Sequence, residues 1–549
     1  MHATMQDVPL SLNHFLERAG TLFPTREIVS RLPDKSYVRH TYADFYRRSR
    51  ALAAALLAAG LRKGDRVATL CWNHHAHLEA YFGIPAAGGV MHTLNLRLSP
   101  DEIGWIAHHA DDRILIVDDI LLPLYRQFAH LHRFERVIVF PFSGAPVAVQ
   151  AGDPHAGEPA VDDYERLLAA APAGFDYVPH AETDPISMCY TSGTTGRPKG
   201  VVYSHRSTVL HSLVASLNDY AAMTDADVVF PVTPMFHANS WGVPYMAVMV
   251  GASLVFPGPH LHADDLLDQM QLYPPTLSLG VPTIWLTIVQ NLEAQPGRWK
   301  MPAGMRSLVG GSAVPESLIR AYAAHGVRIK QAWGMTETSP VATMAYLKAE
   351  LAGASDDESF RRKALQGVPV PLVSLRIVGE DGKPGPWDGK AVGELQVSGP
   401  YITGSYHNVP RDPEKFTDDG WLRTGDVASV DEYGYVRLSD RTKDLIKSGG
   451  EWISSVDLEN AIMAHPAVAE AAVIAVPHPK WDERPLACVV LRPGQALEPA
   501  ALREFLAGRF ARWQLPDAIE FIDAIPRTST GKFFKAKLRE RYAGWQWPA

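Results

Sequence analysis

Cysteine is scarce in this sequence, and long apolar runs are missing. The chain of 549 residues has three cysteines, Cys71, Cys189 and Cys488, which lie far apart and form no C-x-x-C pair. A disulfide framework is therefore not expected, and this usage favours a reducing compartment such as the cytoplasm. The longest apolar stretch, residues 245–256 (YMAVMVGASLVF), is too short for a membrane-spanning helix, which takes about 20 residues.

Signals for secretion and for nucleic-acid binding are also lacking. The N-terminal residues MHATMQDVPLSLNHFLERAG have no basic start followed by an apolar core, so no signal peptide is expected. A formal net charge of −8 argues against nucleic acid as the main partner. We therefore expect a cytoplasmic protein. Peripheral contact with a membrane stays open as an alternative.

The pattern of apolar residues predicts an α/β protein. The composition, 46% hydrophobic and 20% charged, suits a globular chain with two or more domains. Up to about residue 345, β-rich runs alternate with helical patterns, as where RSLVGG precedes PESLIRAYAAHG. This alternation predicts largely parallel sheets covered by helices. Between residues 374 and 399, β runs separated by D-G turns predict a small antiparallel element.

The last part of the chain predicts a second domain. After the charged segment at residues 435–454, a helical pattern, two strands and another helix follow one another. About 110 residues are enough for a separate α+β domain. We place the boundary near Asp440, which gives a large domain at residues 1–440 and a small domain at residues 441–549.

The segment YTSGTTGRPKG, Tyr190 to Gly200, has the composition of a phosphate-binding loop. It follows the apolar run PISMCY, which predicts a buried strand, so the loop lies at a strand end. Backbone N–H groups, hydroxyls and the ammonium of Lys199 can all approach an anion. The common pattern G-x-x-x-x-G-K-[ST] is not present, because Pro198 stands where its second glycine belongs. A surface loop is the alternative, and the density of glycines, hydroxyls and lysine argues against it.

Two later motifs have candidate binding residues whose ordinary interpretation is structural. In QAWGMTETSP, Trp333 offers a flat face for a base, and Glu337 offers a hard oxygen ligand for Mg²⁺. A threonine and glutamate after a strand are more often a helix cap, so Thr336 alone favours that alternative. In WLRTGDVA, Asp426 could bind ribose hydroxyls, although by itself it is better explained as a turn aspartate.

A basic segment, PRTSTGKFFKAKLRERY, follows near the C-terminus. Most of its charges fit a solvated helix, whereas Lys532 follows a Ser-Thr-Gly turn that could deliver its ammonium to an anionic centre.

The histidines of NHHAH (residues 73–77) have no zinc-like spacing and no cysteine partners, so a metal site is not expected there. His237 and Trp241 in PMFHANSW fit either a pocket wall or the core.

Taken in order, these motifs resemble those of the adenylate-forming (ANL) superfamily of acyl-CoA synthetases, peptide adenylation domains and luciferases. The matching motifs are YTSGTTGRPKG, PMFHANSW, GGSAVP, WGMTETSP, RTGD, DRTKDLIKSGGEWIS and RTSTGK. The stretches DLIKSGGEWISSVDLEN and VPHPKWDERP are similar to medium- and long-chain fatty acyl-CoA synthetases. The resemblance implies that ATP and a carboxylate give an acyl-adenylate, from which coenzyme A displaces AMP. It also implies Mg²⁺ as cofactor and a homodimer.

The resemblance also implies roles for particular residues. The ATP and AMP site would consist of Thr191, Ser192, Gly193, Thr194, Thr195, Gly196, Lys199, Gly311, Ser312, Gln331, Trp333, Gly334, Thr336, Asp426, Arg441, Lys443, Lys447, Trp452 and Lys532. The catalytic residues would be Lys532, Thr336 and Glu337, with Thr191 and Glu337 holding Mg²⁺. Ser192 and Trp333 stand where threonine and tyrosine are common.

Three further groups of residues follow from the same resemblance. The acyl pocket would be formed by His237, Ala238, Trp241, Gly242 and Gly280. The hinge would be Asp440, and the channel for coenzyme A would be lined by Gly449, Gly450 and Glu451. Alternatives that remain are a free-standing enzyme that loads a carrier protein, a CoA ligase for short thioether or aryl acids, and a nucleotide sensor without catalysis.

Overall fold

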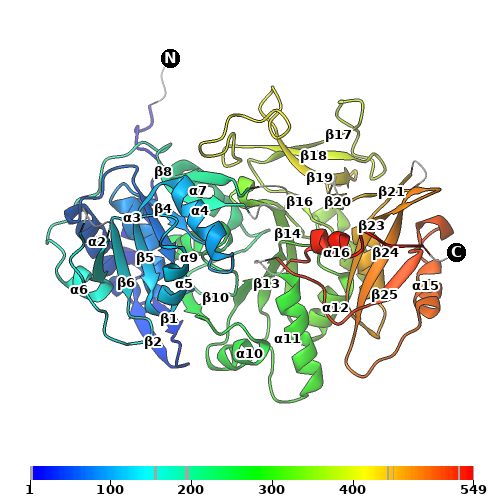
Figure 1. Ribbon diagram of the computed structural model, residues 1–549, viewed down its shortest axis with the longest axis horizontal. Helices are drawn as coiled ribbons and strands as arrows, with labels where there is room; N and C mark the ends of the chain where they lie inside the picture. The colour runs from blue at the N-terminus through cyan, green and yellow to red at the C-terminus, as the bar shows by residue number, and fades with distance from the viewer. Residues whose placement is uncertain are drawn as a thin grey trace.

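The computed structural model describes residues 4–153, 158–191, 197–441, 444–448, 451–528 and 532–547, and of Arg441 only the backbone. These residues form four β-sheets. Figure 1 shows the blue-to-green elements gathered in one large body, with the orange and red C-terminal elements at its side. Within the described residues, no helix combines the length and the apolar character that a bilayer crossing requires.

The first sheet has seven strands in the order β7-β6-β5-β3-β4-β8-β9. Its strands are β3 (Arg66–Leu70), β4 (Val90–Thr93), β5 (Asp112–Asp118), β6 (Arg136–Phe140), β7 (Ala160–Asp163), β8 (Pro185–Tyr190) and β9 (Gly200–Ser204). Neighbouring strands are parallel except β8 and β9. The helices of this part are α2 (Tyr42–Ala58), α3 (His75–Ala86), α4 (Pro100–Ala110), η1 (Asp119–Leu121), α5 (Leu122–Phe128) and α6 (Tyr164–Ala169).

The second sheet has nine strands in the order β16-β15-β14-β13-β12-β10-β11-β1-β2. Its strands are β1 (Glu27–Arg31), β2 (Tyr37–Thr41), β10 (Val228–Pro231), β11 (Ser253–Phe256), β12 (Leu277–Gly280), β13 (Arg306–Gly310), β14 (Arg328–Gly334), β15 (Val341–Met344) and β16 (Val368–Pro369). The accompanying helices are α1 (Asn13–Leu22), α7 (His205–Ala215), α8 (Ala238–Trp241), α9 (Val243–Val250), α10 (Ala263–Leu272), α11 (Pro282–Ala294), α12 (Glu316–Ala324), η2 (Thr336–Thr338), η3 (Ala349–Leu351) and α13 (Asp356–Lys363).

The two remaining sheets follow in sequence. The antiparallel sheet that the D-G turns predict is confirmed and consists of β17 (Ser374–Val378), β18 (Gly393–Ser398), β19 (Leu422–Val430) and β20 (Val436–Arg441). The C-terminal sheet contains β21 (Ile446–Ser448), β22 (Glu451–Ile453), β23 (Val468–His478), β24 (Asp482–Leu491) and β25 (Ala518–Phe521). It is accompanied by α14 (Ser455–Met463), α15 (Pro499–Ala507), η4 (Arg512–Gln514) and α16 (Lys535–Arg541). The α/β fold expected from the sequence is therefore confirmed.

Asn73, at the start of the NHHAH segment, is buried where the first two sheets meet. Its Nδ2 donates to the carbonyl oxygens of Pro231 at 3.1 Å and Thr233 at 2.9 Å. Its Oδ1 accepts the N–H of Met235 at 2.7 Å. One side chain between β3 and α3 therefore satisfies three backbone groups of the segment that leads from β10 to His237. Leaving these buried groups unpaired would be costly.

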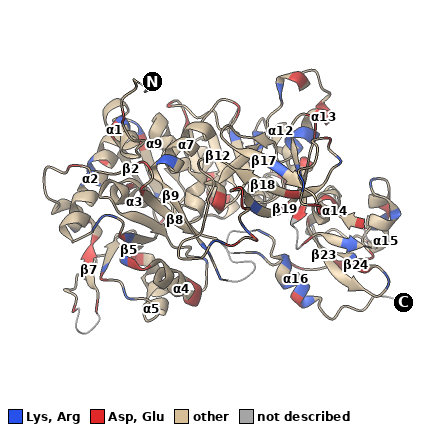
Figure 2. Ribbon diagram, turned by 90° about the horizontal axis from the view of Figure 1, so that it is seen from above, with Lys and Arg blue, Asp and Glu red and all other residues tan. Residues whose placement is uncertain are grey.

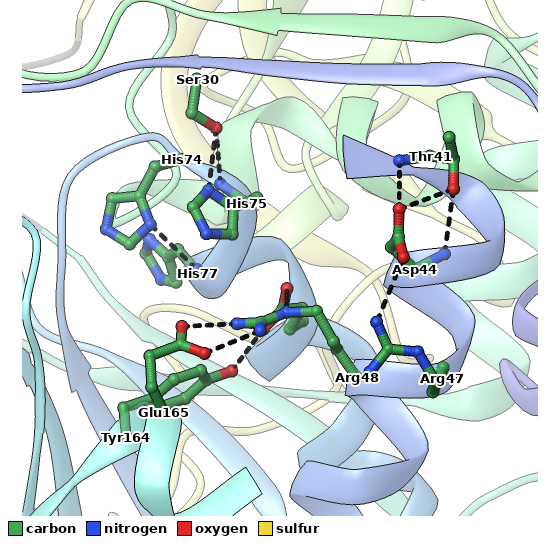
Figure 3. A network of polar contacts seen from close by, with 11 residues as sticks. Ser30, Thr41, Asp44, Arg47, Arg48, His74, His75, His77, Tyr164 and Glu165 are labelled. Atoms are coloured by element: carbon green, nitrogen blue, oxygen red, sulfur yellow. Dashed lines mark hydrogen bonds and ion pairs between the residues drawn. The ribbon is translucent and has the colours of Figure 1, made fainter. Parts of the chain in front are cut away.

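A buried arginine network holds α2, α3 and α6 together (Figure 3). Arg48 Nε donates to Glu79 Oε1 at 2.7 Å, and its Nη2 donates to Glu165 Oε1 at the same distance. Tyr164 donates its hydroxyl to the other oxygen of Glu79 at 2.7 Å. Burial raises the pKa of Glu79, and the charge of Arg48 opposes that rise. The carboxylate is thus paired and hydrogen-bonded, as a buried charge must be.

Several histidines of the core are buried in a neutral form, which predicts acid sensitivity. Burial lowers the pKa of His77, His205 and His211 to about 3 in the fold. An unfolded histidine has a pKa of about 6.5, so below that pH the unfolded chain binds more protons than the folded one. The free energy of unfolding therefore decreases as the pH is lowered. We expect the thermal midpoint to drop between about pH 7.5 and pH 5.5, with each histidine costing about 1 kcal/mol at the lower pH.

Scanning calorimetry of the variant His211→Gln tests this expectation, because glutamine keeps an acceptor for the Val341 N–H that His211 Nε2 now accepts. The variant should lose part of the drop in midpoint. His14→Gln is the matched control, since His14 is exposed. An equal drop in both variants and in the parent would contradict the assignment to buried histidines.

Candidate functional site

The candidate site begins where β13 and β14 end. Gln331, buried in β14, accepts the N–H of Val314 on its Oε1 at 3.0 Å. This bond fixes the turn after β13, which contains Gly311 and Ser312. Gly311 has a φ of +88°, in the left-handed region that glycine adopts without strain. Three residues predicted for the nucleotide site therefore lie together.

A hydrogen bond between two buried side chains joins β14 to β19. Trp333 Nε1 donates to Asp426 Oδ2 at 2.9 Å, and both residues are 8% exposed. Asp426 lies inside β19, opposite Arg441 of β20, so its interpretation as a turn aspartate is wrong. Because the indole has only one N–H donor, this bond also fixes the orientation of the ring.

The segment before α16 brings Lys532 to the same place. A Cβ added to Gly311 would lie 3.1 Å from Lys532 Cε and 3.8 Å from its Nζ. The backbone of Lys532 is held by Thr528, whose N–H donates to the Lys532 carbonyl at 2.7 Å. Burial, together with the charges of Lys532 and Arg97, lowers the pKa of His237 to about 3. His237, Gly311 and Lys532 are thus neighbours, although they are far apart in the sequence.

The ends of the glycine-rich loop are held together by backbone and side-chain bonds. Thr191 N–H donates to the Lys199 carbonyl at 3.0 Å, and Lys199 N–H donates to Thr191 Oγ1 at 3.2 Å. Lys199 Nζ lies 3.6 Å from Asp412 Oδ2 and 4.9 Å from the ring centroid of Tyr406. Ser192 to Gly196 lie outside the described residues.

Tyr406 holds the carboxylate of Glu337. Its hydroxyl donates to Glu337 Oε1 at 2.7 Å, and Glu337 is 6% exposed. Burial raises the pKa of Tyr406, and the neighbouring carboxylate raises it further, so the phenol remains a donor. Thr336 is the first residue of η2, after Met335 at its N-cap, so the helix-cap interpretation of Thr336 is wrong. Tyr203 donates its hydroxyl to the Thr336 carbonyl at 2.8 Å.

Helix α4 contacts both ends of the glycine-rich loop. His109 Nδ1 lies 2.7 Å from the hydroxyl of Tyr190, the last residue of β8. Trp105, one turn earlier in α4, stacks on His109 with 4.9 Å between ring centroids. The guanidinium of Arg197 lies 5.1 Å from the centroid of Trp105. Sequence reasoning missed these residues, because nothing in the local pattern of α4 connects it with a loop some eighty residues later.

The predicted acyl-pocket residues form an unusual turn. Ala238, Asn239, Ser240, Trp241 and Gly242 all have positive φ, between 44° and 76°. Such a conformation is unfavourable for residues other than glycine and persists only where its surroundings hold it. Asn239 Nδ2 donates to Ser187 Oγ at 2.9 Å, and Ser240 Oγ donates to the Thr233 carbonyl at 2.8 Å.

This turn points its aromatic ring toward the nucleotide residues. A Cβ added to Gly310 would lie 3.6 Å from Trp241 Cη2, so the indole packs beside the turn that carries Gly311. A Cβ on Gly242 would lie 2.9 Å from the ring of His211, and one on Gly280 would lie 2.9 Å from Trp285 Nε1. Larger residues would therefore need neighbouring rings to move.

The remaining predicted residues lie on the small C-terminal sheet, in β14 (Gly334), in β20 (Asp440) or outside the described part. Lys447 on β21 and Trp452 on β22 face each other, with Nζ 5.3 Å from the ring centroid. Glu451 is exposed and pairs with Ser448. The predicted residues outside the described part are Ser192, Gly193, Thr194, Thr195, Gly196, Lys443, Gly449, Gly450 and the side chain of Arg441.

A cluster of possible metal ligands lies elsewhere, around the NHHAH segment. Ligand atoms of Cys71, His74 and Asp118 lie within 4.8 Å of one another, so the expectation that these histidines have no cysteine partner is wrong. His74 Nε2 lies 2.8 Å from Asp118 Oδ1, and Asp118 Oδ2 accepts the N–H of Trp72 at 2.8 Å. His74 Nδ1 accepts the N–H of His77 at 3.3 Å. These bonds satisfy His74 and Asp118 without an ion, so the cluster is explained as structural.

Comparison with known proteins decides the family. Residues 16–407 match the model of the AMP-binding enzymes, and residues 457–532 match that of the AMP-binding enzyme C-terminal domain. The chain belongs to the AMP-binding enzyme family. It is an ATP-dependent, AMP-forming acyl-CoA synthetase, as its resemblance to the adenylate-forming superfamily implied.

Two relatives and one solved structure show how close this similarity is. The chain is 50% identical to a long-chain-fatty-acid–CoA ligase of Thermus thermophilus over 542 residues, 98% of this chain and 97% of the relative. It is 41% identical to a 3-methylmercaptopropionyl-CoA ligase of Ruegeria pomeroyi, covering 99% of both chains. The crystal structure of the anthranilate CoA ligase AuaEII with anthranoyl-AMP matches with a TM-score of 0.85 at 25% identity, over 98% of this chain and 99% of that one.

The bond between Trp333 and Asp426 leads to a test in this enzyme. In Trp333→Phe the ring remains, but the indole N–H that donates to Asp426 Oδ2 is lost. Removing one partner of a buried hydrogen bond costs about 1–3 kcal/mol, so we expect KM for ATP to rise about ten-fold or more, with a smaller change in KM for the acid. Steady-state pyrophosphate release measures both. Trp513→Phe is the control, because Trp513 is 43% exposed. An unchanged KM for ATP would contradict a role of this bond in the nucleotide site.

Proposed function

We propose that this protein joins a fatty acid to coenzyme A through an acyl-adenylate, releasing AMP and pyrophosphate. One observation carries the proposal: the side chain of Lys532, from the segment between β25 and α16, lies against Gly311. The same turn is tied to Gln331 in β14, and Trp333 of that strand is bonded to Asp426. An ammonium beside a polar, partly buried nucleotide pocket is what a reaction between two anions requires.

In the first step a carboxylate oxygen of the acid attacks the α-phosphorus of ATP. The bond from that phosphorus to the bridging oxygen breaks, and the electron pair leaves with pyrophosphate. Lys532 would lie between the carboxylate and the α-phosphate and lower their mutual repulsion, and Thr336 would contact the α-phosphate. Such fixed charges stabilise a transition state more than solvent can, because they need no reorientation during the reaction.

The glycine-rich loop would hold the β- and γ-phosphates as the leaving group. We assign this role to Thr191, Ser192, Gly193, Thr194, Thr195, Gly196 and Lys199. Lys199 already lies at the closed base of the loop, where it bonds with Thr191. Tyr190 and Arg197 on either side are held by α4. The base of the loop is thus supported from outside the nucleotide pocket.

Thr191 and Glu337 fit a magnesium ion by their chemistry. A hydroxyl and a carboxylate are hard oxygen donors, which Mg²⁺ prefers. Tyr406 bonds to one oxygen of Glu337, and this leaves the second oxygen for a cation. When bound, Mg²⁺ would neutralise phosphate charge; the protein residues would orient the phosphates.

The remaining nucleotide contacts follow the same assignment. Gly311, Ser312, Gln331 and Trp333 would line the adenine pocket, and Gly334 would belong to the ATP and AMP site. Asp426 and Arg441 would bind the ribose hydroxyls, with Lys443, Lys447 and Trp452 nearby.

The second step would use a rotation about Asp440 between a large domain (residues 1–440) and a small domain (residues 441–549). The rotation would withdraw Lys532 and bring Gly449, Gly450 and Glu451 to the channel for coenzyme A. The thiol would then attack the acyl carbonyl carbon, and AMP would leave with the electron pair of the broken bond. A cytoplasmic location, a homodimer and peripheral membrane contact stay predictions.

The acyl group would lie beside His237, Ala238, Trp241, Gly242 and Gly280. The helix that follows the turn, α9, is almost wholly apolar and buried, which suits an aliphatic tail. The relative at 50% identity acts on long-chain fatty acids, which favours a fatty acid here. A second candidate is a short thioether acid, because the relative at 41% identity is a 3-methylmercaptopropionyl-CoA ligase.

A panel of acids separates the two candidates. We expect CoA-dependent AMP release with saturated acids of about six to sixteen carbons, with kcat/KM rising with chain length, because each buried CH₂ contributes about 0.8 kcal/mol. 3-Methylmercaptopropionate should be a poorer substrate. A preference for that acid over every fatty acid of the panel would support the second candidate and overturn the first.

Lys532→Ala tests the assigned chemistry. It should lower the rate of pyrophosphate release from acid and ATP by at least about a hundred-fold, the size of effect seen when one preorganised donor is removed. Conversion of preformed acyl-AMP and coenzyme A to thioester should continue within a few-fold, because the proposed second step does not use this lysine. Lys537→Ala, on the exposed side of α16, is the matched control. Undiminished adenylation in Lys532→Ala would refute the role.

A further inference from the structure

A cluster of buried charges lies three residues after Lys532, at the start of α16. Lys535 Nζ is 2.7 Å from Glu459 Oε1 of α14, and these side chains are only 12% and 10% exposed. The same ammonium donates to Ser455 Oγ at 2.5 Å. Figure 2 shows α16, with its basic positions in blue, next to the strands of the C-terminal sheet. Most lysines of such a helix face water, so a buried one needs an explanation.

The proposed hinge residue belongs to the same cluster. Asp440, 4% exposed, accepts the N–H of Ser455 on Oδ2 at 3.0 Å. Burial raises the pKa of Asp440, and the charge of Lys535 opposes the rise. Burial also disfavours the charged form of Lys535, but the carboxylates of Glu459, Asp440 and Asp444 reverse this and raise its pKa. Lys535 is therefore a cation that faces three carboxylates.

The short segment between Lys532 and Lys535 restricts how far the two residues can move relative to each other. Three residues span at most about 10 Å even when fully extended. Lys532 N–H donates to Thr528 Oγ1 at 3.2 Å, and Phe534 N–H donates to the Pro526 carbonyl at 2.7 Å. The described flanks of this segment, residues 526–528 and 532–534, are thus paired with each other, and the ammonium of Lys535 fixes the end that leads into α16. Displacing that ammonium would move the base from which Lys532 reaches Gly311.

We propose that Lys535 is a positioning residue for adenylate formation, which holds the segment that carries Lys532 to α14 and to the hinge carboxylate Asp440 through its buried ion pair with Glu459. The proposal rests on the role assigned to Lys532 above. The ammonium of Lys535 is already paired with Glu459 and Ser455, so it would act by fixing the position of Lys532. The first half-reaction, which needs Lys532 in the site, should depend on it more than the second.

The test compares the two half-reactions in the full-length enzyme carrying Lys535→Met. Pyrophosphate release from acid and ATP reports adenylation, and thioester formation from preformed acyl-AMP and coenzyme A reports the second step. We expect kcat of adenylation to fall about ten-fold or more while KM for ATP stays within about two-fold, as for loss of an interaction made in the transition state. The second step should stay within about three-fold. Lys535→Arg, which keeps the charge, should recover part of the loss.

Lys537→Met is the matched control, because it makes the same substitution two residues later at an exposed position of α16. It should leave both half-reactions unchanged. If Lys535→Met leaves adenylation unchanged, or lowers both half-reactions equally in a folded protein, the inference is wrong. If Lys535→Met does not fold, the variant with Lys535→Met and Glu459→Gln decides, since removing both charges of a buried pair avoids an uncompensated one. Equal loss in both half-reactions of that variant overturns the inference.

Lys532→Ala separates failure of this inference from failure of the proposed function. Retained adenylation in Lys532→Ala would remove the function assigned to Lys532 and the inference with it. Lost adenylation in Lys532→Ala together with normal adenylation in Lys535→Met would remove only the positioning role of Lys535.

Discussion

The arrangement of this enzyme depends on one constraint: the ammonium of Lys532 has to reach from the segment before α16 to the backbone of Gly311. An enzyme that joins two anions needs positive charge at the point of contact. A residue with a side chain at Gly311 would meet Lys532 Cε at 3.1 Å, so the close approach depends on a glycine. The turn that carries this glycine is in turn fixed by Gln331.

Other parts of the site are held by buried hydrogen bonds between side chains. Trp333 and Asp426 join two sheets, and Tyr406 fixes the carboxylate of Glu337. Each of these bonds satisfies buried polar groups, which is why loss of one partner is costly. Stability and orientation therefore come from the same contacts.

Farther from the site, buried polar side chains connect the first two sheets. Asn73 bonds three backbone groups of the segment that ends at His237, and the left-handed turn after it is held by Asn239 and Ser240. Strain of this kind persists only where the surroundings over-determine the conformation. The position of Trp241 beside Gly310 thus depends on the contacts of the residues that precede it in the turn.

The sequence by itself determined the α/β fold class, the family and the local motifs around Lys199, Glu337 and Lys532, because strand, glycine turn and charged residue are adjacent in the chain. It could not decide between alternatives for Asp426 and Thr336, whose side chains are understood only from their neighbours. It missed the donor to Glu337, because Tyr406 lies 69 residues away.

Only the tertiary structure decided which distant groups meet. It showed that His74 has Cys71 and Asp118 beside it, contrary to what the spacing suggested, and that hydrogen bonds account for the cluster. It also showed that Lys535, which in the sequence is one of several basic residues of a helix, is a buried partner of Glu459. The physical reason is the same in each case: burial, pairing and charge balance depend on groups brought together by the fold, and their separation along the chain leaves no local pattern.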